Sequence, residues 1–83
     1  MPGNLSRSEA DSIVRSALRG FASDEDLAAL TQDEPLRAAL ELDSLDFLTF
    51  VEKLTRATGV RIEEDDYPQL VSIHACVDFL ATE

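Results

Sequence analysis

The chain has 83 residues, of which 17 are Asp or Glu and 7 are Lys or Arg, so its formal net charge is −10. This excess of acid argues against binding to nucleic acid and to anionic membrane surfaces, and it favours partners with a basic docking patch. Its only cysteine, Cys76, and its only histidine, His74, exclude an internal disulfide framework and the usual clusters of zinc ligands. We therefore expect one small domain over residues 1–83, with no membrane span and a cytoplasmic location.

The first predicted helix covers about residues 9–19 and follows a frayed start at residues 1–7. Ser8 is a suitable N-cap for this helix, and Gly20 is a suitable stop. The apolar side chains recur at spacings of three and four residues, which indicates a single apolar stripe. They are Ile13, Val14, Ala17, Leu18 and Phe21.

A long loop with one or two helical turns is expected over residues 21–43. Asp24 can cap a short turn that carries Leu27 and Leu30, and Pro35 suits the first position of another short helix. A loop of this length inside a compact domain usually has a function or a local structure of its own.

The strongest helical pattern lies at residues 44–58. Asp43 can cap this helix, and Gly59 can end it. The apolar arc of the helix is too wide for one contact surface, because Leu48 and Phe50 cannot both point into the same narrow seam. We therefore expect one part of the helix to face the core and another part to face something else.

The last part of the chain predicts a short helix or turn at residues 63–70 and a final helix that Ser72 caps and that runs to about residue 81. The apolar stripe of the final helix consists of Ile73, Cys76, Val77 and Leu80. No alternating pattern of a β-strand is present. The sequence thus predicts an all-α fold, with three main helices and several short ones packed as a bundle.

Few residues could carry catalysis or bind a metal. His74 has no serine, cysteine or carboxylate at a convincing spacing for a nucleophile and base, so we expect a structural histidine. Cys76 falls on the apolar stripe and should be a buried, inert thiol. The acidic runs at residues 24–26 and 63–66 do not have the alternating pattern of a calcium loop. We expect neither a catalytic residue nor a metal site, and an enzyme is not expected.

Ser44 is the strongest candidate for chemistry. It lies in Leu-Asp-Ser-Leu-Asp at residues 42–46, at the start of the predicted long helix. A helix N-terminus accommodates a negatively charged phosphodiester, because backbone N–H groups and the helix dipole face it. The alternative is that Ser44 or Asp43 only caps the helix, and local chemistry alone favours this alternative.

Residues 36–80 resemble acyl carrier proteins and the related peptidyl or aryl carrier domains. The shared features are Asp-Ser-Leu-Asp at the start of a helix, an apolar series after it, Thr-Gly-Val at its end, an acidic turn and a short closing helix. The resemblance implies an acyl-carrier-protein-like four-helix bundle with a long first loop and a short third helix. It also implies that Ser44 carries a 4′-phosphopantetheine arm from coenzyme A, and that the arm holds an acyl group as a thioester.

The partners that this resemblance implies are a phosphopantetheinyl transferase and acyl-transfer or acyl-modifying enzymes with basic docking patches. We expect the carrier to be a monomer that is not itself catalytic. The residues that we expect to contact these partners are Asp43, Leu45, Asp46, Leu48 and Glu52.

The sequence departs from the usual fatty-acid carriers along the helix after Ser44. Thr49 stands where an acid is common, and Lys53 and Arg56 add positive charge. We therefore expect a specialised carrier in fatty-acid, lipid or secondary-metabolite synthesis. Two alternatives remain open, which are an aminoacyl or peptidyl carrier with the same fold and an unmodified acidic helical adaptor.

Overall fold

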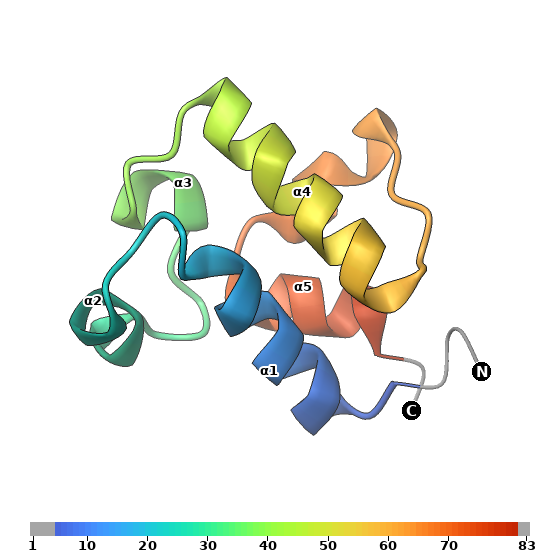
Figure 1. Ribbon diagram of the computed structural model, residues 1–83, viewed down its shortest axis with the longest axis horizontal. Helices are drawn as coiled ribbons and strands as arrows, with labels where there is room; N and C mark the ends of the chain where they lie inside the picture. The colour runs from blue at the N-terminus through green and yellow to red at the C-terminus, as the bar shows by residue number, and fades with distance from the viewer. Residues whose placement is uncertain (1–4, 82–83) are drawn as a thin grey trace.

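The computed structural model describes residues 5–81, and this part of the chain is helical with no β-strand (Figure 1). Its elements are α1 (Arg7–Leu18), α2 (Asp24–Ala29), α3 (Leu36–Ala39), α4 (Ser44–Thr58), the 3₁₀ helix η1 (Glu64–Leu70) and α5 (Ile73–Leu80). The helices α1, α4 and α5 form the bundle together with the short η1, while α2 and α3 lie in the long first loop. The predicted all-α architecture is confirmed.

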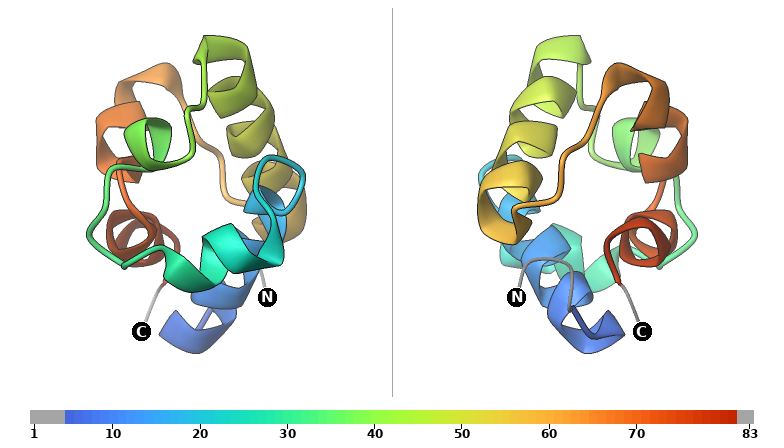
Figure 2. Two further views of the ribbon diagram at one scale, coloured as in Figure 1. Left: turned by 90° about the vertical axis from the view of Figure 1, so that its left-hand side faces the viewer. Right: turned by 90° about the vertical axis from the view of Figure 1, so that its right-hand side faces the viewer.

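The helices surround one core, and Figure 2 shows their arrangement from two sides. α1 packs against both α4 and α5, and η1 packs against α5. The largest side chains with almost no exposed surface come from all of these elements and from α3. They are Phe50, Leu18, Leu36, Leu54, Leu70, Ile73, Leu80, Val14 and Cys76.

The first helix begins earlier than the sequence predicts. Ser6 is its N-cap and forms a capping box with Glu9: the Ser6 hydroxyl accepts from the Glu9 N–H at 3.0 Å, and the Glu9 carboxylate accepts from the Ser6 N–H at 3.1 Å. The choice of Ser8 as the cap was therefore wrong. The frayed start predicted for residues 1–7 is wrong for residues 5–7, because Leu5 packs against the core; residues 1–4 lie outside the described residues.

The end of α1 and the start of α2 also differ from the prediction. α1 ends at Leu18, and Gly20 follows it without the left-handed backbone of a glycine stop. The cap of α2 is Ser23 rather than Asp24, because the Ser23 hydroxyl accepts from the Asp26 N–H at 3.1 Å. A serine followed by an acid three residues later is the arrangement that satisfies two free N–H groups at once.

The long first loop is fixed to the start of α5 by two backbone hydrogen bonds. The Leu36 N–H donates to the Val71 carbonyl at 2.8 Å, and the His74 N–H donates to the Gln32 carbonyl at 2.9 Å. Pro35 takes the N-cap position of α3, one residue before the predicted one. These contacts hold α3 in place directly before α4.

Both predicted ends of α4 are confirmed. Asp43 is the N-cap, and Gly59 ends the helix with a left-handed φ of 73°. The wide apolar arc divides as expected, since Phe50 is fully buried whereas Leu48 is 43% exposed. At the end of the chain Ser72 caps α5 as predicted, and its hydroxyl accepts from the Ala75 N–H at 3.1 Å.

Candidate functional site

Ser44 is the first residue of α4 and is exposed. It lies between two acids that cap the helix together. The Asp43 carboxylate accepts from the Asp46 N–H at 2.8 Å, and the Asp46 carboxylate accepts from the Asp43 N–H at 3.3 Å. The cap is therefore Asp43 and not Ser44, so the hydroxyl of Ser44 is not used to hold the helix.

Within residues 5–81, the Ser44 hydroxyl makes no hydrogen bond to another residue, whereas the Thr49 hydroxyl donates to the Leu45 carbonyl at 3.0 Å. The difference has a simple cause: a hydroxyl within a helix can reach the carbonyl one turn earlier, but Ser44 has no helical turn before it. The backbone N–H groups of Ser44 and Leu45 belong to the first turn, whose N–H groups have no partner within the helix. An exposed hydroxyl beside free N–H groups fits a covalently attached phosphodiester.

The structure places three of the predicted docking residues on one side of α4. Leu45 is 74% exposed, Leu48 is 43% exposed, and Glu52 is also exposed. Their spacings of three and four residues align them along the helix. Asp43 and Asp46 lie beside them in the capping box. The cap at Asp43 was predicted from the sequence, whereas the structural role of Asp46, which is half-buried, was not.

A hollow of about 500 Å³ lies beside the start of α4, and we call it the aromatic hollow. The rings of Phe47 and Tyr67 meet edge to face in its wall, with centroids 5.5 Å apart. The guanidinium carbon of Arg37 lies 5.8 Å from the centroid of the Phe47 ring. The complete lining is Pro35, Arg37, Phe47, Tyr67, Pro68 and Val71. Arg37 and Tyr67 could not be predicted as lining residues from the sequence, because they come from α3 and η1 and belong to no motif.

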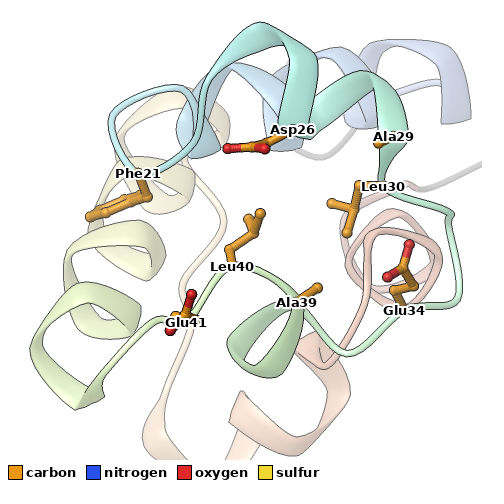
Figure 3. A pocket seen from close by; sticks show the side chains of 8 residues that line it. All are labelled: Phe21, Asp26, Ala29, Leu30, Glu34, Ala39, Leu40 and Glu41. Atoms are coloured by element: carbon orange, nitrogen blue, oxygen red, sulfur yellow. The ribbon is translucent and has the colours of Figure 1, made fainter.

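A second hollow, of about 290 Å³, lies between α2, α3 and the segment that leads into α4 (Figure 3). Leu40 projects into it, and three acids line it, namely Asp26, Glu34 and Glu41; we call it the acidic hollow. Glu41 has a left-handed φ of 54°, and among residues 5–81 it is the only residue other than glycine with a positive φ. This conformation is strained for a residue with a Cβ.

His74 and Cys76 have the positions that their sequence context predicts. His74 is exposed and lies 3.2 Å from Asp78, whose other carboxylate oxygen is 2.7 Å from the Arg7 guanidinium. The hydrogen bond from Arg7 is the main cause that lowers the pKa of Asp78 from its ordinary value. Cys76 is fully buried, and burial raises the pKa of its thiol to about 12.

Within residues 5–81, no group of three or more His, Cys, Asp or Glu side chains is arranged to hold a metal ion. No helix in the described part of the chain is long and apolar enough to cross a membrane.

A family model described as a phosphopantetheine attachment site matches residues 12–80. Comparisons with curated proteins and with solved structures gave no significant match. The matched range contains all of α4, η1 and α5, and it includes Ser44.

Proposed function

Because the chain belongs to the phosphopantetheine attachment site family, and is therefore a carrier protein with a covalently attached 4′-phosphopantetheine, we propose that Ser44 bears this group. One observation carries the proposal: the Ser44 hydroxyl is exposed at the first residue of α4, between two acids that cap the helix in its place. The alternative was that Ser44 or Asp43 only caps the helix. Asp43 is the cap, so a capping role no longer accounts for the serine.

In this function the chain positions the attachment point and does not catalyse the transfer. When bound, the arm supplies a terminal thiol on which a cargo is held as a thioester. Asp43 and Asp46 keep the first turn of α4 in place, and the N–H groups of Ser44 and Leu45 face the attachment point. A separate phosphopantetheinyl transferase removes the proton of the Ser44 hydroxyl, whose oxygen attacks the pyrophosphate of coenzyme A at the phosphorus next to the pantetheine. The phosphodiester to Ser44 forms as the P–O–P bond breaks, and adenosine 3′,5′-bisphosphate leaves. Carrier domains of this family are generally not catalytic.

We further propose that the cargo is an acyl group and that enzymes with basic patches dock on Leu45, Leu48 and Glu52. An exposed apolar pair beside an acid suits such a partner, since charge sets the encounter rate and a central apolar contact sets the residence time. An aminoacyl or peptidyl cargo is the alternative, and the same surface would serve it. The unmodified adaptor no longer has an observation in its favour.

The structure refines the reasons for proposing a specialised carrier. Lys53 is half-buried, with its ammonium 4.9 Å from the centroid of the Phe21 ring, so it leans toward α1 rather than toward the docking residues. Arg56, in contrast, lines a hollow of about 290 Å³ together with Leu48 and Glu52. The proposal of specialised partners therefore rests on Thr49 and Arg56, and Lys53 does not contribute to it.

The attachment is tested by intact mass measurement. The apo protein is incubated with coenzyme A, Mg²⁺ and a transferase of broad specificity. The native chain should gain the mass of one phosphopantetheine group, and Ser44→Ala should gain none. Ser8→Ala removes an exposed serine from α1 and is the matched control, which should be modified like the native chain. Modification of Ser44→Ala would contradict the assignment.

Docking is tested by a pair of charge reversals. Glu52→Lys should slow the transferase at low salt, and the loss should shrink as NaCl is raised, because salt screens the exposed charge. Glu25→Lys makes the same change on α2 and should leave the rate close to that of the native chain. Equal slowing by both variants would show that only net charge matters. The mass of the loaded protein from its own host separates an acyl cargo from an aminoacyl cargo.

A further inference from the structure

The aromatic hollow begins close to the attachment point. Ser44 and Phe47 are three residues apart on α4, and side chains at this spacing lie on the same side of a helix, with Cβ atoms about 5–6 Å apart. Arg37 connects the two positions. Its Nε donates to the Leu42 carbonyl at 3.4 Å, and its guanidinium lies over the Phe47 ring. The positive charge is thus held between the backbone just before Ser44 and the wall of the hollow.

The charge of Arg37 has no acidic partner in the described part of the chain. Arg7, Arg15, Arg19 and Arg61 each pair with a carboxylate, but no carboxylate of residues 5–81 lies within ion-pair distance of Arg37. A guanidinium has five N–H donors, and the bond to Leu42 uses one of them. In a chain with 17 acids, this arginine is available to an anion from outside the fold.

We propose that Arg37 binds the phosphodiester of the arm and that the aromatic hollow holds the geminal dimethyl group that follows the phosphate along the arm. This inference rests on the proposed attachment at Ser44. The groups of the site follow the same order as the groups of the arm. Arg37, close to Ser44, matches the phosphodiester, and the aromatic hollow beyond it matches the apolar dimethyl group. Phe47, Tyr67 and Pro68 give the hollow rigid apolar walls.

The electrostatics of the neighbouring hollow support this direction for the arm. The acidic hollow is lined by Asp26, Glu34 and Glu41, whose carboxylates repel a phosphodiester (Figure 3). The aromatic hollow has Arg37 in its lining and no acid. A negatively charged arm that leaves Ser44 is therefore attracted to one hollow and repelled by the other.

The experiment compares the apo and holo forms of the native chain and of two variants. Arg37→Gln removes the charge and keeps a hydrogen-bond donor. Arg56→Gln makes the same change on the last turn of α4 and is the control, since Arg56 also has no carboxylate within ion-pair distance in residues 5–81. Intact mass first establishes that each holo form carries one group, so a failure of attachment is recognised before the arm is studied.

Three measurements then test the site. In the native holo form, the ¹⁵Nε–¹H signal of Arg37 should shift relative to apo, and the dimethyl protons should show Overhauser contacts with the rings of Phe47 and Tyr67. The melting temperature should rise by about 4 °C on conversion to holo at low salt, as expected for one charge-assisted contact in a domain of this size. Arg37→Gln should abolish this rise, and Arg56→Gln should keep it.

The results that overturn the proposal are equally specific. If the ¹⁵Nε–¹H signal of Arg37 is the same in the apo and holo forms, Arg37 does not contact the phosphodiester, and the proposal is wrong. If the dimethyl protons of the holo form show no Overhauser contact with the rings of Phe47 and Tyr67, the arm does not occupy the aromatic hollow, and the proposal is wrong. If Arg37→Gln lowers the melting temperature of apo and holo equally, Arg37 only stabilises the fold, and the proposal is wrong.

Discussion

Asp43 and Asp46 exchange hydrogen bonds across the first turn of α4, with each carboxylate accepting from the backbone N–H of the other residue. The arrangement satisfies two N–H groups that a helix start otherwise leaves free. It also means that the two acids on either side of Ser44 are structural groups as well as charges that a partner can meet. A substitution at either position therefore changes helix stability and recognition together.

Asp46→Lys should have two separable effects. Loss of the capping bond should lower the free energy of unfolding by about 1 kcal/mol. Loss of the negative charge should slow modification by the transferase, and this part should diminish as NaCl is raised. Asp46→Asn retains an oxygen that can accept from the Asp43 N–H, so its stability should stay closer to that of the native chain. Urea unfolding and a mass-based rate assay measure the two effects, and a slowing of Asp46→Lys that is identical at all salt concentrations would contradict the role of charge.

Glu41→Gly should stabilise the protein by about 1 kcal/mol. Glu41 adopts a φ of 54°, which costs a residue with a Cβ about 1–2 kcal/mol, while glycine has no such cost but loses more entropy on folding. Gly59→Ala is the mirror test, because it introduces a Cβ at a φ of 73° and should destabilise by a similar amount. The midpoints of urea unfolding give both values, and a less stable Glu41→Gly would show that the Glu41 side chain compensates for its strain.

The sequence predicted the bundle because its main helices carry regular apolar stripes between clear stops. It predicted the bounds of α4 well, since Asp43 and Gly59 are strong signals at both ends. It misplaced the start of α1, because Ser8 is followed three residues later by Asp11 just as Ser6 is followed by Glu9. Asp11 instead accepts from the Arg15 Nε at 3.0 Å. The capping box favours Glu three residues after the serine, so Glu9 after Ser6 was the local signal that distinguishes the two serines.

The candidate site was predictable only where it is local. Ser44 and its flanking acids form one continuous motif, so the sequence identified them. The aromatic hollow combines α3, α4 and η1, and the pairing of Phe47 with Tyr67 depends on how these elements pack. The position of Lys53 over Phe21 likewise depends on the packing of α1 against α4. For this reason the sequence alone did not show that the Lys53 charge lies away from the docking residues.

The buried thiol of Cys76 should make the free energy of unfolding fall as the pH rises through the alkaline range. Burial raises the pKa from its ordinary value of 9.0 to about 12, so the folded state favours the protonated thiol. This contribution to stability is complete below pH 9 and is lost as the pH rises toward 12, with a slope of about 1.4 kcal/mol per pH unit. Cys76→Val has no titrating group, so the difference between the two unfolding curves isolates the thiol. Parallel curves between pH 9 and 11 would contradict the raised pKa.

The contact between Arg7 and Asp78 should make the stability of the fold depend on pH in the acidic range. The pKa of Asp78 is lowered, chiefly by the hydrogen bond from Arg7, so the folded state favours the carboxylate. This contribution is present above the ordinary pKa of 3.8 and is lost as the pH falls through the lower value of the folded state. Asp78→Asn should be less stable than the native chain at pH 6, and the difference should shrink as the pH falls below 3.8. A constant difference in melting temperature down to pH 2 would contradict this linkage.

The ion pair between Arg7 and Asp78 also marks where this molecule can be joined to others, because α1 packs against α5 at this point. It brings the beginning of α1 and the last turns of α5 together, at 2.7 Å, while the start of α4 lies toward the opposite end of the molecule (Figure 1). A tether, a surface linkage or a neighbouring domain connected through either end would therefore leave the serine pointing outward. The same geometry suits a separate carrier protein and one domain of a multidomain protein, and the attachment point is the same in both.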